Sequence, residues 1–119
     1  MSEVKNIRIS VRADEISAQL VEMGYFSTQI DCYRAAIALA ISKDLSPSTS
    51  AKLELNKWDT ASVFRDPKSN TASLVELFFS QDEAVEKGMG LAENGLEYID
   101  QQRLAGHDVW RILLDASAT

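Results

Sequence analysis

The chain has 119 residues, of which 45% are hydrophobic and 25% are charged, a composition typical of one compact globular domain and not of a disordered or fibrous chain. The formal net charge of −6 at pH 7 repels nucleic acids and anionic membranes, so any contact with DNA must come from a local basic stripe. One cysteine excludes an internal disulfide, and one cysteine with one histidine cannot supply the usual ligands of a zinc site.

The first predicted element is a strand, because apolar and polar residues alternate strictly from Asn6 to Arg12. Ile7, Ile9 and Val11 point to one side of such a strand, and the polar residues between them point to the other. The alternation therefore predicts a β-strand with one buried face.

Two helices are predicted after this strand. The first opens with Asp14 and Glu15, whose carboxylates suit a helix N-terminus, and it ends at Gly24. We expect Ser27 to cap the second helix, which is rich in alanine. The Ser- and Pro-containing stretch at 46–50 closes this unit.

The remainder is predicted to be a connector followed by further helices. Residues 47–70 have no sustained helical period, and we expect an ordered connector with room for a short extended piece. One helix is expected around 74–79, and another from the capping box at Ser80 to about Arg103, in which some glycines allow close packing. A short last helix is expected at 109–114.

The fold class predicted from these elements is mainly α. Residues 47–119 carry seven basic and twelve acidic side chains, so the acidity belongs to the second half of the chain. We divide the chain into a strand-helix-helix unit at 1–46, the connector at 47–70 and an acidic helical unit at 71–119.

The sequence contains none of the catalytic motifs whose spacing is informative. Any Ser–His or Cys–His arrangement would have to use His107, which we interpret as a loop or capping residue. The acidic turn at 82–86 suits a helix start better than a cation site, and Cys32 suits a small buried role. Trp58 and Trp110 are interpreted as anchors in the core or toward a partner. We predict no enzyme activity, no cofactor and no metal.

Three segments, Ile7–Arg12, Gly24–Ser27 and Arg34–Ile37, together resemble the ribbon-helix-helix superfamily. This resemblance implies that the strands of two chains pair into an antiparallel ribbon, which enters the major groove of DNA. A lone strand cannot satisfy its edge hydrogen bonds, so it needs a partner strand. Pairing with a second copy would supply that strand and would also bury the apolar face. The predicted dimer core is Ile7, Ile9, Val11, Ile37 and Ile41.

The polar face of the ribbon would then contact DNA. Arginine can bond to guanine and asparagine to adenine, and the resemblance places the start of the second helix beside a phosphate. The predicted DNA-binding residues are Lys5, Asn6, Arg8, Ser10, Arg12, Ser27 and Thr28.

The order of elements along the whole chain is similar to that of the small DndE-type proteins of bacterial DNA phosphorothioation and anti-phage systems. The similarity includes the connector with Trp58, the Phe-rich helix and the long helix that contains residues 92–98. It implies a non-enzymatic, helical, DNA-associated accessory protein. The net charge of −6 departs from the basic surface that such a protein needs where it touches DNA.

We therefore predict a bacterial, cytoplasmic, non-enzymatic DNA-binding protein that regulates transcription or assists anti-phage defence. It would form a homodimer or a higher homo-oligomer, bind a protein through its acidic C-terminal helices and not contact a membrane. The alternative is a protein-binding adaptor, immunity protein or antitoxin that dimerises through the same strand without touching DNA.

Overall fold

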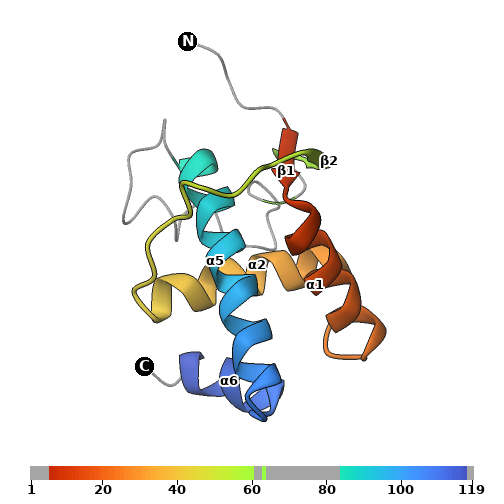
Figure 1. Ribbon diagram of the computed structural model, residues 1–119, viewed down its shortest axis with the longest axis vertical. Helices are drawn as coiled ribbons and strands as arrows, with labels where there is room; N and C mark the ends of the chain where they lie inside the picture. The colour runs from red at the N-terminus through yellow and green to blue at the C-terminus, as the bar shows by residue number, and fades with distance from the viewer. Residues whose placement is uncertain (1–5, 61–62, 64–83, 118–119) are drawn as a thin grey trace.

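The computed structural model describes residues 6–60, 63 and 84–117 and is mainly helical, with one short antiparallel sheet that includes the N-terminal strand (Figure 1). In chain order the elements are β1 (Asn6–Ile9), α1 (Val11–Glu22), α2 (Gln29–Ser42), β2 (Leu55–Asp59), α5 (Ala84–Leu104) and α6 (Val109–Ser117). The mainly α fold with a strand before its helices is thus as predicted. None of the helices described combines the length and apolar character of a membrane span.

The long helix α5 is the central element of the molecule. It runs along the long axis, with α2 crossing it and α1 on one side (Figure 1). The sheet lies toward one end of the molecule and α6 lies at the other (Figure 1). Features at the two ends are therefore separated by most of the length of α5.

Glycines allow α5 to pack closely against its neighbours. A Cβ at Gly95 would overlap the backbone carbonyl of Ala36 in α2, and a Cβ at Gly90 would come within 2.9 Å of the Pro47 side chain. The close packing predicted for some glycines of this helix is confirmed at these two positions.

The strand β1 pairs with β2 of the same chain. The antiparallel register places Ile7 opposite Trp58 and Ile9 opposite Leu55, with a shift in register between these pairs. Ile7 and Ile9 are fully buried, and Trp58 makes a T-shaped contact with Tyr33 in α2 with ring centroids 5.2 Å apart. The extended piece that the connector was expected to contain is β2.

The strand is shorter than the alternation of residues predicts. Ser10 is the N-cap of α1, and its hydroxyl accepts the Ala13 backbone N–H at 2.9 Å. A serine hydroxyl that satisfies a free donor stabilises a helix start, and this local bond ends the strand at Ile9. The prediction that placed Val11 and Arg12 on the strand is therefore wrong, because both lie in the first turn of α1.

The other helix ends follow the predictions more closely. Thr28, not Ser27, is the N-cap of α2, and its hydroxyl accepts the Asp31 N–H at 3.1 Å. Gly24 has a φ of 89° just after α1, as expected of the residue that ends a helix. The long helix ends at Leu104, close to the predicted end, and α6 begins at the predicted residue. The helix expected at 74–79 and the capping box at Ser80 lie outside the described residues.

The hydrophobic core already covers most of the residues assigned to a dimer core. Ile7, Ile9 and Ile37 are fully buried within the single chain, and Ile41 is partly buried. They are covered because α5 supplies the apolar surface that the prediction assigned to a second copy. Val11 differs, since it is 46% exposed on α1.

Candidate functional site

The outer face of the sheet retains part of the predicted DNA-binding surface. Asn6 and Arg8 are exposed, on the face opposite to the buried isoleucines. The register places Asp59 across from Asn6 and Asn56 across from Arg8. The face therefore carries one arginine and one aspartate, which gives it no net positive charge.

Ser10 is not on this outer face. Its side chain and backbone are directed to Glu93 of α5: the Ser10 hydroxyl donates to Glu93 Oε1 at 2.6 Å, and the Ser10 backbone N–H donates to Oε2 at 3.1 Å. Both residues are buried. The predicted contact between Ser10 and DNA is therefore corrected to an internal contact that joins the strand–helix junction to α5.

The carboxylate of Glu93 also affects a neighbouring tyrosine. Burial, and next the negative charge of Glu93, raise the pKa of the Tyr33 hydroxyl far above its ordinary value. This hydroxyl has no hydrogen-bond partner among the described residues. Tyr33 is therefore held as a neutral core residue at all physiological pH values.

Arg12 is also engaged within the chain. Its guanidinium contacts Glu97 at 3.2 Å and Asp100 at 2.6 Å, and Asp100 in turn binds Arg103 at 2.8 Å. The hydrogen bond and charge of Glu97, together with Asp100, raise the pKa of Arg12. Arg12 therefore clamps α1 to α5, and its contact with DNA stays a prediction.

Both edges of β1 are occupied. Alternate residues of an antiparallel strand direct their N–H groups to opposite edges. One edge pairs with β2, while on the other the Arg8 N–H lies 3.4 Å from Met89 Sδ and the Ser10 N–H donates to Glu93. A ribbon shared by two copies would have to displace either β2 or α5.

The start of α2, the predicted phosphate site, is exposed but not strongly positive. Ser27 and Thr28 are both exposed. Asp31 lies in the first turn of α2, where its carboxylate competes with a bound phosphate for the helix N-terminus. Lys57, the nearby cation, is paired with Asp14 at 3.0 Å. The remaining predicted residue, Lys5, lies outside the described residues.

A different surface stands out at the end of the molecule where α1 and α5 end and α6 begins. Among the described residues, four large hydrophobic side chains are strongly exposed, and three of them belong to this end: Met23 (47%), Leu104 (69%) and Trp110 (51%). We call these three residues the apolar end. The neighbouring elements are in contact here, because Arg103 of α5 donates a hydrogen bond to Gln19 of α1.

The local sequence of α6 explains why Trp110 faces outward. Val109 and Ile112 are buried, and the helical period directs Trp110 away from this pair. The indole makes a T-shaped contact with the ring of Tyr25 from the α1–α2 loop, with ring centroids 5.6 Å apart and an interplanar angle of 64°. The tryptophan is therefore half-exposed and rests against a second aromatic ring.

Residues with catalytic potential are dispersed or buried. In the ranges that the structure describes, no three His, Cys, Asp or Glu side chains gather as a metal site. Cys32 is fully buried, and burial raises the pKa of its thiol to about 12, which keeps it protonated. His107 lies in the exposed loop between α5 and α6. The acidic turn at 82–86 is described only in part. Glu86 is exposed on α5, whereas Asp82 and Glu83 lie outside the described residues.

The buried acids of α5 are the structural residues that the sequence analysis missed. Positions 89, 93, 96 and 100 follow the spacing of the buried helix face, so Glu93 and Asp100 interrupt an apolar stripe. A carboxylate in such a position must find donors, because an unpaired buried charge is costly. This signal is present in the sequence, but the partners, Ser10 for Glu93 and Arg12 for Asp100, are set by the tertiary structure.

Comparison with known proteins adds no assignment to this geometry. No protein-family model, curated protein or solved structure matches the chain.

Proposed function

We propose that this chain is a binding subunit that recruits a protein partner through the apolar end, Met23, Leu104 and Trp110. The observation that carries the proposal is the position of these side chains, three of the four strongly exposed large hydrophobics in the described residues. Large apolar side chains that are exposed on one part of a domain mark an interaction site more often than singly scattered ones do.

Trp110 is the proposed anchor. Tryptophan is enriched among the residues that dominate binding energy at protein interfaces. Its contact with Tyr25 orders the indole before binding, so the complex loses less side-chain entropy. Truncation of such an anchor costs about 2 kcal/mol or more in binding free energy.

The partner that fits this surface has an apolar patch with a basic rim. Glu22, which ends α1 next to Met23, is exposed beside the apolar end. The whole chain carries a net charge of −6, which favours the approach of a basic protein. These features support the alternative of an adaptor, immunity protein or antitoxin over the DNA-binding alternative.

DNA binding by the sheet stays a prediction, and the geometry supports it less. Arg8 and Asn6 are available on the outer face, but Arg12 is neutralised by Glu97 and Asp100. Sequence-independent affinity for DNA depends on the number of phosphates that free cations neutralise, and this face offers few.

Affinity capture from cells of the source organism, with the intact chain as bait, tests the proposal. We expect wild type to retain a basic protein in stoichiometric amount and Trp110→Ala to lose it. Val11→Ala is the matched control, since Val11 is equally exposed but lies at the start of α1, toward the other end. Equal retention by Trp110→Ala and wild type would contradict the proposal.

Two parallel measurements separate the other functions. If light scattering shows a dimer that Trp110→Ala dissociates, the apolar end serves self-association and the partner proposal fails. If a labelled duplex binds at moderate salt and Arg8→Ala abolishes the binding, DNA recognition by the sheet replaces the proposal.

A further inference from the structure

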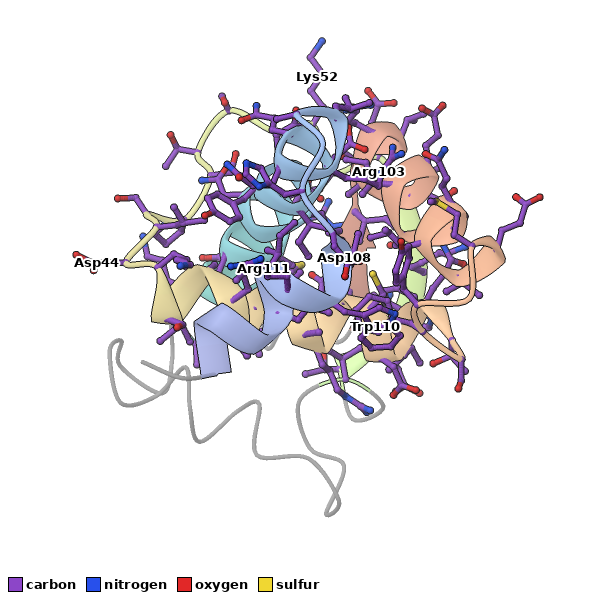
Figure 2. All side chains as sticks on the ribbon, turned by 90° about the horizontal axis from the view of Figure 1, so that it is seen from below. Asp44, Lys52, Arg103, Asp108, Trp110 and Arg111 are labelled. Atoms are coloured by element: carbon purple, nitrogen blue, oxygen red, sulfur yellow. The ribbon has the colours of Figure 1, made fainter. Side chains whose placement is uncertain are left out.

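A cavity of about 580 Å³ lies between the end of α2, the C-terminal turns of α5 and α6. Its polar lining consists of Lys43, Tyr98, Gln102, His107, Asp108 and Arg111. Arg111 and Trp110 lie on different sides of α6, so the cavity is separate from the apolar end (Figure 2). Its volume falls within the range of small-molecule sites.

The charge of this lining is opposite to that of the whole chain. Lys43 follows α2 and Arg111 lies on α6, and Asp108 is the one carboxylate among the residues that line the cavity. Within the described residues, neither Lys43 nor Arg111 has a carboxylate within 4.0 Å, whereas Arg12 and Arg103 are paired. Two cations that pair with no carboxylate of the described residues thus face one cavity in an acidic protein.

Other groups add hydrogen-bond donors to the same space. Tyr98 and Gln102 come from one face of α5, and His107 from the loop that follows it. Gly106, His107 and Asp108 border the cavity just before α6, so the positive end of that helix dipole also lies beside it. The donors come from separate elements, and therefore the fold, not a single flexible segment, brings them together.

We propose that this cavity binds a phosphorylated small molecule through its phosphate group. A phosphate monoester carries a charge of about −1.5 to −2 at pH 7 and three strong acceptor oxygens, which matches two cations and several neutral donors. Arginine can hold two of the oxygens at once, and lysine supplies a point charge. The cavity exceeds the size of a phosphate, and the Tyr98 ring and Ile112 offer apolar contact to the rest of the molecule.

Titration of the isotopically labelled full chain, followed by amide NMR shifts, tests this site. The probes are inorganic phosphate and ribose 5-phosphate at constant ionic strength, with chloride as the reference anion. We expect saturable shifts at Lys43 and at residues 106–112, and tighter binding of the sugar phosphate than of inorganic phosphate.

The variants identify the groups responsible. Arg111→Gln should weaken binding about tenfold or more, because a charge-assisted hydrogen bond is lost. Lys43→Gln is a second test on another element, in case Arg111→Gln disturbs α6. Arg8→Gln, an exposed arginine on the sheet, should leave the affinity unchanged.

Several outcomes would overturn the proposal. These are shifts spread over the whole surface, shifts equal to those with chloride, and equal affinity in wild type, Arg111→Gln and Lys43→Gln. A duplex DNA that binds through Arg111 while both small probes do not would also overturn it, in favour of a backbone phosphate. None of these outcomes depends on Trp110, so the site and the partner proposal can fail separately.

Discussion

Replacing Glu93 with alanine tests how β1 is held in place. Glu93 accepts two hydrogen bonds from Ser10, and both residues are buried. A hydrogen bond to a charged group contributes about 1.5–3 kcal/mol, and relief of the buried carboxylate offsets part of the loss. We therefore expect Glu93→Ala to lower the free energy of unfolding by about 2–4 kcal/mol.

Urea unfolding followed by circular dichroism measures this change. The slope of the unfolding free energy against urea concentration should be the same for the variant and wild type. Glu86→Ala is the matched control, because Glu86 is exposed on the same helix and should change stability by less than about 0.5 kcal/mol. A cycle with Ser10→Ala isolates the bond to the hydroxyl, for which we expect a coupling of about 1 kcal/mol or more.

The reasoning is refuted if Glu93→Ala matches the control or if the cycle shows no coupling. In either case the carboxylate would not close the second edge of β1. A stable Glu93→Ala variant that dimerises would further indicate that this edge can pair with another strand.

Three further predictions concern other parts of the fold. Gly95→Ala should lower the free energy of unfolding by about 1–3 kcal/mol, since the added methyl group overlaps an α2 carbonyl; a variant as stable as wild type would contradict that contact. Burial alone raises the pKa of Asp14, but hydrogen bonds from Lys57 and Gln29 outweigh it and lower the pKa. Asp14 therefore stabilises the fold above its unfolded pKa. The difference in melting temperature between wild type and Asp14→Asn should shrink as the pH falls from about 7 to about 3. A difference that stays constant over this range would contradict the prediction. Burial raises the pKa of Cys32 to about 12, so iodoacetamide should modify the chain at about pH 8 only after unfolding. Mass spectrometry detects the modification. A native chain that is modified would refute the burial of this thiol.

The sequence predicted the helices better than the strands. The stripe through Met89, Leu96 and Ile99 follows the helical period over about three turns, and it located α5 with an end one residue from the observed Leu104. The N-terminal alternation continues through Ser10 to Arg12, so it could not show that Ser10 would cap a helix. Local hydrogen bonding decided that boundary, and periodicity is not sensitive to it.

The candidate sites depended on contacts between distant residues. Arg12 and Ser10 look like surface groups in the sequence, and their partners Glu93, Glu97 and Asp100 lie more than eighty positions away. The sequence left Trp110 as either a core residue or an anchor for a partner. Only the packing of Val109 and Ile112 beneath α6 placed it on the surface.

By itself, the amino-acid order determined the helical class, the main helices, the burial of Ile7 and Ile9 and the acidic character of the chain, because these follow from local periodicity and composition. The tertiary structure decided what covers the N-terminal strand and which carboxylates pair with Arg12 and Arg103. The physical reason is that strand edges and buried carboxylates are satisfied by whichever groups the fold brings near them, and spacing along the chain does not encode that choice.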